Sequence, residues 1–369
     1  MSTILIKNGR VIDPANQVDG IRDILIGNGV IARVEKDLRA PGAQTIIDAK
    51  DKIVLPGLVD MHVHLREPGR EDKETVLTGT KAALCGGVTS VLAMPNTTPA
   101  MDTPESVLLL KKMIASTAQA NVFIAGTLTQ NRAGIALADF AALKKVGVTA
   151  ISDDGSSVED AALMAEAFRR AKAAGLLVIC HCEDKALAGR GVMNLGYMST
   201  VLGLRGISAA AEYQRVQRDI ELAAAAGCPV HIAHVSCRES IAAIAAAKKK
   251  GLSVTAETAP HYFTFTDEVL ADYDTNFKMN PPLRGAADVA AIKEALKDGT
   301  IDAIASDHAP HTENEKDVEF DRAEFGVTGL ETELGAAITA LVDPGHLTWS
   351  ALVQKLSLNP ARILGLDRG

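Results

Sequence analysis

The sequence lacks the long apolar segments that mark membrane and exported proteins. No uninterrupted apolar run approaches the roughly 20 residues that a helix needs to cross a bilayer. Residues 1–13 also lack the basic and then apolar pattern of a signal peptide. These absences exclude a transmembrane protein and a membrane partner, and we expect a cytoplasmic chain.

Cysteine and positive charge are scarce as well. The five cysteines form an odd number without the regular spacing of a disulfide framework, so we expect reduced, buried thiols in a reducing compartment. Lysine and arginine number 38 against 46 aspartates and glutamates, which gives a formal net charge of -8. Because phosphate binding depends on clustered Lys and Arg, this balance argues against a nucleic-acid partner. An anionic small-molecule substrate would need a specific local cation.

The first part of the chain predicts a small β domain over residues 1–55. It contains three stretches rich in β-branched residues and bounded by turn formers. They are ILIKNGRVID, DILIGNGVIARVE and TIIDAKDKIVLPG. Beyond Pro56 and Gly57, apolar runs of strand length alternate with Ala-, Lys- and Glu-rich stretches of helical length, which is typical of a parallel sheet in an α/β protein.

Residues 56–369 predict a (β/α)8 TIM-like barrel, because they contain eight apolar runs of strand length. The runs are LVDMHVHL, TSVLAMP, NVFIAGTLT, VTAISDD, LLVICHC, PVHIAHVS, LSVTAETAPHYF and IDAIASDHAPH. A doubly wound sheet is the alternative. Most runs end in polar or ionisable groups, and in a barrel these C-terminal ends meet on the face that carries the chemistry. Amphipathic stretches such as residues 208–226 and 239–250 would cover the outside.

Imidazole and carboxylate groups recur at the ends of the first, fourth, fifth, sixth and eighth runs. They are His62, His64, Asp153, Asp154, His181, His231, His234 and Asp307. Taken singly, a strand-end Asp can cap the next helix, and His231 is expected to be a core or supporting residue. Taken together on one face, they predict a metal centre with nitrogen and oxygen ligands, which suits Zn2+, with Co2+ or Mn2+ as substitutes.

Two cysteines flank one of these histidines and raise the question of thiolate ligands. Cys180 and Cys182 are the direct neighbours of His181. Side chains alternate between the two faces of a strand, so neighbours of an inward-pointing ligand point outward. We therefore expect both cysteines to be buried structural residues.

Several motifs resemble a known family. LPGLVDMHVHLREPG resembles the entry motif of the amidohydrolase superfamily, and ALCGGVTSVLAMPNTTP, FKMNPPLRG and IASDHAPHT resemble signatures of type I dihydroorotases. The resemblance extends from the N-terminal strands to the NPAR motif at residues 359–362, which is most of the chain. It implies a zinc-dependent cyclic amide hydrolase that interconverts N-carbamoyl-L-aspartate and L-dihydroorotate in de novo pyrimidine (UMP) biosynthesis.

The resemblance also implies a set of ligands for two zinc ions per chain. One ion would be held by His62, His64 and Asp307 and the other by His181 and His234. The carboxylate between them would come from Asp153, with Asp154 as the less favoured bridge. Related hydantoinases and dihydropyrimidinases resemble this pattern but bridge their metals with a carboxylated lysine of the fourth strand. The stretch VTAISDDG offers no lysine, so a hydantoinase- or allantoinase-type enzyme is the second choice.

The resemblance assigns further roles at the active face. Asp307 would be the general base and then the general acid of the reaction. Arg66, two residues after His64 in the sequence, would bind the α-carboxylate of the substrate. Asn96 and His311 resemble its helpers, and Asn280 resembles a contact to the ring.

Three expectations concern the periphery and the partners. The acidic stretch 312–325 is expected either as a mobile lid or as an inert surface loop. Family members commonly continue into strands that rejoin the N-terminal β unit, whereas this sequence ends at Gly369, so either a C-terminal tail is missing or the small domain is reduced. We expect a homodimer. Aspartate transcarbamoylase is a candidate partner, but inactive dihydroorotase-like subunits beside it lack several metal ligands, and this chain keeps them all.

Overall fold

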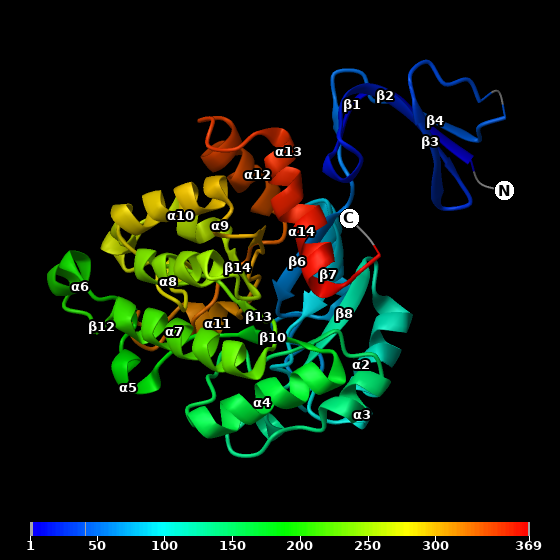
Figure 1. The fold of residues 1–369 in the computed structure, drawn as a ribbon. Coiled ribbons are helices and arrows are strands. Elements are labelled where there is room, and N and C mark those ends of the chain that lie inside the picture. The colour runs from blue at the N-terminus through cyan, green and yellow to red at the C-terminus, as the bar shows by residue number, and fades with distance from the viewer. Residues whose placement is uncertain (1–2, 41, 368–369) are drawn as a thin grey trace.

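The computed structural model describes residues 3–40 and 42–367, and its first unit is a five-stranded sheet (Figure 1). The strands are Thr3–Asp13 (β1), Val18–Gly27 (β2), Val30–Glu35 (β3), Thr45–Asp48 (β4) and Ile53–Val54 (β5). The order is β3-β2-β1-β4, and β5 also pairs with β1. Strands β1, β2 and β3 pair antiparallel, whereas β4 and β5 run parallel to β1. The turn between β2 and β3 uses Asn28 and Gly29, both at positive φ, as tight hairpins require.

The second unit is an eight-stranded parallel barrel. Its strands are Leu58–Val63 (β6), Val88–Ala93 (β7), Asn121–Gly126 (β8), Ala150–Ile151 (β9), Leu177–Cys180 (β10), Val230–Ile232 (β13), Val254–Thr258 (β14) and Ala303–Ile304 (β15). They follow one another around the sheet in chain order. A parallel bridge joins Val63 to His308, and the His64 N–H donates to the His308 carbonyl at 2.9 Å, which connects the first and last strands. The predicted (β/α)8 fold is confirmed, because a doubly wound sheet would reverse its strand order.

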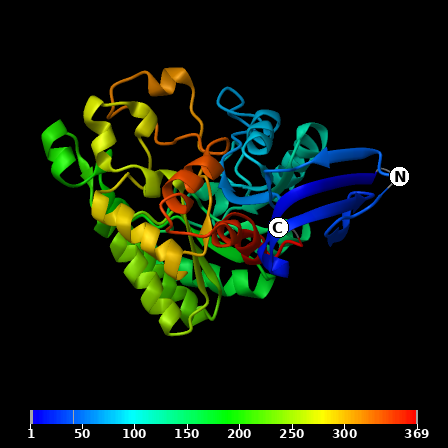
Figure 2. The same ribbon diagram turned by 90° about the horizontal axis from the view of Figure 1, so that it is seen from above.

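Helices cover the outside of the barrel (Figures 1 and 2). The longer ones are Val76–Cys85 (α1), Pro104–Thr117 (α2), Ala161–Ala174 (α4), Ala209–Ala226 (α7), Arg238–Lys249 (α8) and Ala286–Asp298 (α10). The shorter ones are Phe140–Lys145 (α3), Lys185–Ala188 (α5), Tyr197–Leu202 (α6), Pro260–Thr264 (α9), Glu313–Lys316 (α11), Glu333–Ala337 (α12), Trp349–Val353 (α13) and Asn359–Leu364 (α14). Helices α7 and α8 match the two amphipathic stretches expected from the sequence. Among the described residues, no helix is long and apolar enough to cross a membrane.

Short elements complete the chain. Short 3-10 helices lie at Pro14–Asn16 (η1), Gln130–Arg132 (η2), Asp267–Asp272 (η3) and Thr275–Phe277 (η4), and π-helical turns lie at Ile338–Val342 (η5) and Gln354–Leu358 (η6). A two-stranded ribbon pairs Met193–Asn194 (β11) with Gly206–Ile207 (β12). The predicted boundary at residue 55 falls between β5 and β6, and the division into two domains stays a prediction.

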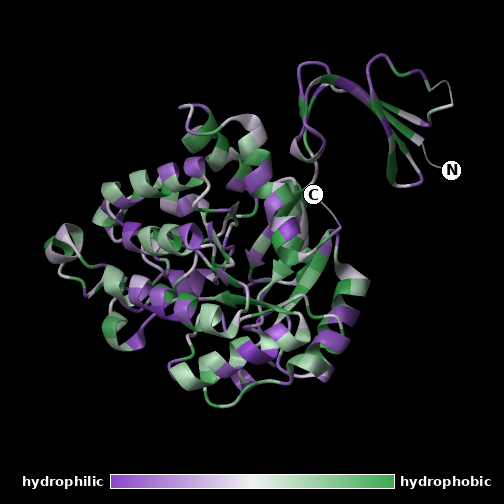
Figure 3. Cartoon of the chain, viewed as in Figure 1, coloured by the Kyte–Doolittle hydropathy of each residue, from purple (hydrophilic) through white to green (hydrophobic). Residues whose placement is uncertain are grey.

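Apolar side chains fill the barrel as well as the space around it, and Figure 3 shows hydrophobic residues concentrated on its strands. One buried cluster collects residues from strands on all sides of the barrel, so it lies in the interior. Its members include Met61, Leu92, Ala125, Ala150, Ile179, Ala233 and Ala303. The larger cluster packs the outer faces of the strands against the helices. The polar residues of the active face lie at the end of this interior cluster.

Two local predictions were wrong. The strand expected over 252–263 ends at Thr258, and Pro260 begins helix α9, where a proline without an N–H fits the first turn. Cys85 is exposed, whereas the other four cysteines are buried as expected. Cys182 contacts Asp219 of α7 on the outer side of the barrel, so the flanking cysteines do point away from the active face.

The close packing of α1 against the C-terminal half predicts that alanine substitutions at two glycines differ in their effect on stability. A Cβ on Gly86, at the end of α1, would lie 1.9 Å from the Leu330 carbonyl oxygen. Gly86→Ala should therefore lower the free energy of unfolding by about 1–3 kcal/mol. Gly335→Ala in α12 meets no atom within 4 Å and should be neutral or stabilising by about 0.5–1 kcal/mol. Urea unfolding of both variants checks this, and equal stability would contradict it.

Candidate metal centre

Six buried ionisable side chains meet at the C-terminal mouth of the barrel. They are His62 and His64 at the end of β6, Asp154 after β9, His181 after β10, His234 after β13 and Asp307 after β15. Each is at most 6% exposed. The ligand set expected from the sequence contained five of these six, and Asp154 was the less favoured choice for the bridge. The structure brings them together because the carboxyl ends of all eight strands face the same way.

The Asp154 carboxylate lies at the centre of the group. Its Oδ1 is 3.2 Å from His62 Nε2, 3.5 Å from His234 Nε2 and 3.7 Å from His181 Nδ1. Its Oδ2 is 3.4 Å from His64 Nε2. One carboxylate therefore contacts imidazoles that come from three different strands.

The Asp307 carboxylate faces the same histidines from the other side. Its Oδ1 lies 3.2 Å from His64 Nε2 and 3.6 Å from His62 Nε2. Two trios have donor atoms within 4.8 Å of one another, one of His62, His64 and Asp307 and the other of His62, Asp154 and His234. The two trios share His62, and they give the site two adjacent places where a cation could bind.

The expectation that Asp153 lies between the two metal positions was wrong, and Asp154 occupies that place. The Asp153 carboxylate accepts from the Leu128 N–H at 2.8 Å and the Thr129 N–H at 3.0 Å, and it also bonds the Thr129 hydroxyl. Ala150 faces the barrel interior, so strand alternation puts Asp154 on the inner side and Asp153 on the outer side. Asp153 therefore supports the turn after β8.

Three residues of the site have an unusual backbone. Arg66, His234 and Asp307 have φ angles of 60°, 36° and 49°, in the left-handed region that side chains disfavour. Strained conformations of this kind persist where the surrounding structure holds them, and they concentrate at functional sites. Here they turn a side chain into the mouth of the barrel just where a strand ends.

The donor atoms fit a metal ion better than they fit one another. His62 Nε2, His181 Nε2, His234 Nδ1 and Asp154 Oδ1 are buried without a hydrogen-bond partner. Buried polar atoms are normally paired, because an unpaired group loses its hydrogen bonds to water without gaining one to the protein. Burial lowers the pKa of His62, but the Asp154 and Asp307 carboxylates outweigh burial and raise this pKa well above its usual value. A cation is the missing partner that this set of nitrogen and carboxylate donors suits.

A buried glutamate holds one of the histidines in place. The two carboxylate oxygens of Glu257, in β14, contact two histidines: Oε1 lies 2.7 Å from His62 Nδ1 and Oε2 lies 3.3 Å from His231 Nε2. On its other side, His231 Nδ1 lies 2.8 Å from the Thr255 hydroxyl. Burial raises the pKa of Glu257, but the contacts with His231 and His62 lower it to about 2. His231 is thus a supporting residue, as expected. The sequence reading missed Glu257, whose only signal was a charged residue inside an apolar strand.

The predicted substrate residues line a cavity of about 260 Å³ over the metal centre. Arg66 Nε donates to the Pro310 carbonyl at 3.1 Å, and its Nη2 lies 3.3 Å from His311 Nε2. Asn96 Oδ1 lies 2.9 Å from His64 Nδ1, and Asn280 Nδ2 donates to Glu183 at 3.0 Å. All four residues contribute to the wall of the cavity.

Parts of the wall were missed from the sequence. Arg132, from the turn after β8, and Glu324 and Phe325, from the end of the acidic stretch, also line the cavity. Lys278 Nζ donates to the carbonyls of Phe320, Asp321 and Ala323 and ties this stretch to the protein. None of these residues follows a strand directly. The sequence predictions depended on that position, so they did not include these residues.

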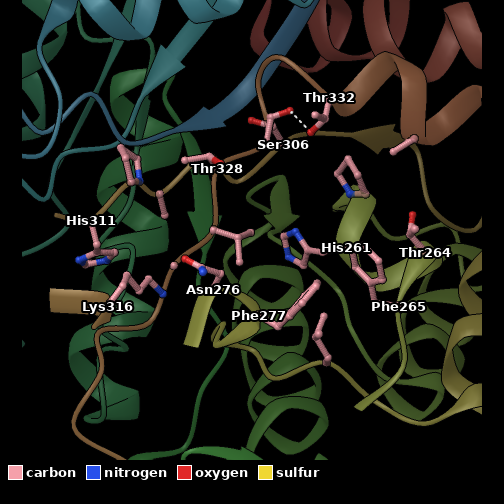
Figure 4. A pocket seen from close by; sticks show the side chains of 18 residues that line it. His261, Thr264, Phe265, Asn276, Phe277, Ser306, His311, Lys316, Thr328 and Thr332 are labelled. Atoms are coloured by element: carbon pink, nitrogen blue, oxygen red, sulfur yellow. Dashed lines mark hydrogen bonds between the residues drawn. The ribbon is translucent and has the colours of Figure 1, made fainter. Parts of the chain in front are cut away.

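A second, more apolar cavity of about 340 Å³ shares Ala309 and His311 with the first. Figure 4 shows this second cavity. Phe265 and Phe277 form part of its wall, and His261 points into it. Burial lowers the pKa of His261 to about 4, so this imidazole is neutral near pH 7. The segment that carries Asp307 thus lies between the two cavities, because Ser306 and Ala309 line the second cavity and Asp307 lines the first.

Comparison with known proteins identifies the family. A family model described as "Dihydro-orotase-like" matches residues 51–240. The dihydroorotases of Elusimicrobium minutum and Geobacter sulfurreducens are 55% and 52% identical to this chain over 99% of its length, which spans 84% and 86% of theirs. The chain belongs to the dihydroorotase family. The resemblance expected from the motifs is thereby confirmed.

Solved structures place this dihydroorotase family member beside other enzymes of the same fold. The L-hydantoinase (dihydropyrimidinase) from Arthrobacter aurescens matches with a TM-score of 0.87 and 25% identity, covering 99% of this chain and 83% of that one. A dihydropyrimidinase from Brevibacillus agri matches with a TM-score of 0.84 and 24% identity, covering 99% and 82%. The latter supports the barrel fold alone.

The role of Glu257 can be tested through the metal. Glu257→Gln keeps the shape and one acceptor but removes the charge that orients His62, so we expect metal affinity to fall about 10- to 100-fold. Glu294→Gln, on the outside of α10, is the control. Titration with a chelator, followed by metal analysis, measures the difference. Equal metal retention in both variants would show that Glu257 only fills the core.

Proposed function

We propose that this protein is a dihydroorotase that interconverts N-carbamoyl-L-aspartate and L-dihydroorotate in pyrimidine biosynthesis. The supporting observation is a cavity that combines a dense imidazole and carboxylate group on its floor with arginine on its wall. The floor suits the hydrolysis of a cyclic amide, and the wall suits an anionic substrate in a chain whose net charge is -8.

Two Zn2+ ions would bind within this group of donors. His62, His64 and Asp307 would hold one, and His181 and His234 the other, with Asp154 shared between them. When bound, such ions would polarise the amide carbonyl and lower the pKa of a water molecule, so that hydroxide is available as the nucleophile near neutral pH. The identity of the metal as zinc and the number of two are part of the proposal.

Asp307 would move the proton of the reaction. Its carboxylate lies at the floor of the cavity, 3.2 Å from His64 Nε2, and the scissile amide of a bound substrate would lie beside it. In ring opening, it would accept the proton of the attacking water and pass it to the departing ring nitrogen. In ring closure, it would take the proton from the ureido nitrogen as this nitrogen attacks the side-chain carboxylate. It would return that proton to the carboxylate oxygen that leaves as hydroxide, which a solvent proton converts to water, so one residue serves as base and as acid.

Arg66 would bind the α-carboxylate of the substrate. The Pro310 carbonyl and His311 fix two of its nitrogens, which orients the guanidinium toward the cavity. Burial lowers the pKa of His311 to about 3, so this helper is neutral and does not compete for the anion. Asn96 would add a donor beside it, and Asn280 would contact the ring.

Two other functions remain alternatives. The similarity to an L-hydantoinase structure favours another cyclic amidase as the second candidate, of the hydantoinase or allantoinase type. A non-catalytic subunit of aspartate transcarbamoylase would not need the complete donor set. The homodimer, the transcarbamoylase partner and the cytoplasmic location stay predictions.

A substrate comparison tests the proposed function. The purified protein, reconstituted with Zn2+, is assayed with N-carbamoyl-L-aspartate at mildly acidic pH and with dihydroorotate, hydantoin and allantoin at neutral to alkaline pH. Turnover of the first two compounds, well above the others, is expected. Preference for hydantoin or allantoin would contradict the proposal, and so would inactivity on all four by protein that contains its metal.

Asp307→Asn separates proton transfer from metal binding. Asparagine keeps the shape and one oxygen donor, so the variant should fold and keep most of its metal. Its kcat should fall by about 10²- to 10⁴-fold in both directions, with little change in KM. Near-normal turnover at full metal content would show that another group moves the proton.

A further inference from the structure

Arg132 is a cation that neither the motifs nor the proposed mechanism uses. It lies in the turn η2 after β8, and its side chain is half-buried in the wall of the active-site cavity. Asn131 and Arg132 both have positive φ angles, 53° and 55°, so two consecutive left-handed residues direct the side chain. A strained turn that places a guanidinium in a cavity calls for a functional explanation.

The hydrogen bonds of Arg132 are incomplete. Its Nη2 donates to the main-chain carbonyl of Asp154, the residue at the centre of the metal site. Its Nε is buried and has no partner. No carboxylate forms an ion pair with this guanidinium within the described residues. A half-buried guanidinium that lacks an ion pair and keeps a buried, unpartnered Nε suits a site that a negatively charged ligand completes.

Its neighbours place this guanidinium beside the predicted substrate residues. A Cβ built on Gly155 would lie 3.2 Å from Arg132 Nη2 and 3.9 Å from Asn96 Nδ2. Asn96 uses its oxygen on His64, which leaves its Nδ2 as a donor on the same side as Arg132. Arg66 lines the same cavity. The absence of a side chain on Gly155 keeps the space in front of the two donors open.

We propose that Arg132 is a second substrate-binding residue, which binds the α-carboxylate of the substrate together with Arg66. A carboxylate has two oxygens and accepts from two guanidinium groups and an amide at once. Asp153 positions Arg132, because it anchors the Leu128 and Thr129 end of the turn from which this side chain projects. The inference rests on the proposed function, since it concerns the same substrate.

The alternative is that Arg132 only fixes the Asp154 carbonyl. Arg132→Met and Arg132→Lys distinguish the two roles, with Gln130→Met as a control in the same turn, because the Gln130 side chain is exposed. The measurements are KM and kcat for dihydroorotate, metal content, and competitive inhibition by orotate, a flat ring with the same carboxylate. Thermal melting of each variant reports whether it folds.

A substrate-binding role predicts a selective loss of affinity. Arg132→Met should raise KM for dihydroorotate and the inhibition constant of orotate about 10- to 100-fold, the range for a charged hydrogen bond, with small effects on kcat and metal content. Arg132→Lys keeps the charge and should recover part of the loss. Gln130→Met should match the wild-type protein.

Three results would overturn the inference. Unchanged KM and orotate inhibition in Arg132→Met would exclude a contact with the carboxylate. A loss of metal and of kcat, with orotate inhibition preserved, would assign Arg132 to support of Asp154 alone. A wild-type protein that contains metal but does not turn over dihydroorotate would overturn the proposed function, and the inference with it.

Discussion

The site depends on one buried carboxylate that is surrounded by imidazoles. Asp154 lies within 3.7 Å of ring nitrogens from His62, His64, His181 and His234, which reach it from three strands. A carboxylate buried in this way is costly unless positive charge and hydrogen bonds compensate for its lost hydration. The unpaired donor atoms around it indicate that a cation belongs in the arrangement. The closed barrel is what holds the ligands in register, through the contact between Val63 and His308.

The two neighbouring aspartates at the end of β9 have different roles. Asp154 points into the barrel, whereas Asp153 points outward and binds the turn that carries Arg132. Arg132 in turn bonds the Asp154 carbonyl. One short segment thus connects the metal centre to the wall that faces the substrate. Substitution of Asp154 should therefore affect the metal centre, whereas substitution of Asp153 should affect the cavity wall that carries Arg132.

Much of the fold and of the site could be predicted from the sequence, because both follow from simple periodicities. The eight apolar runs became the eight barrel strands, and the strand-end rule located His62, His64, His181, His234 and Asp307. The choice between Asp153 and Asp154 failed, because β9 has only two residues and its inward face cannot be read from so short an alternation. Glu257 was hidden in an apolar strand, and Arg132 in a turn whose direction depends on two left-handed residues.

Metal content of two neighbouring variants tests the central role of Asp154 most directly. Asp154→Asn and Asp153→Asn make the same chemical change one residue apart and are compared with the wild-type protein, expected to hold about two ions per chain. Asp154→Asn should lose at least half of its metal, because the shared carboxylate is gone. Asp153→Asn should keep its metal and show its defect in substrate affinity. Full metal in Asp154→Asn, or its loss in Asp153→Asn alone, would contradict the placement of Asp154 at the centre of the site.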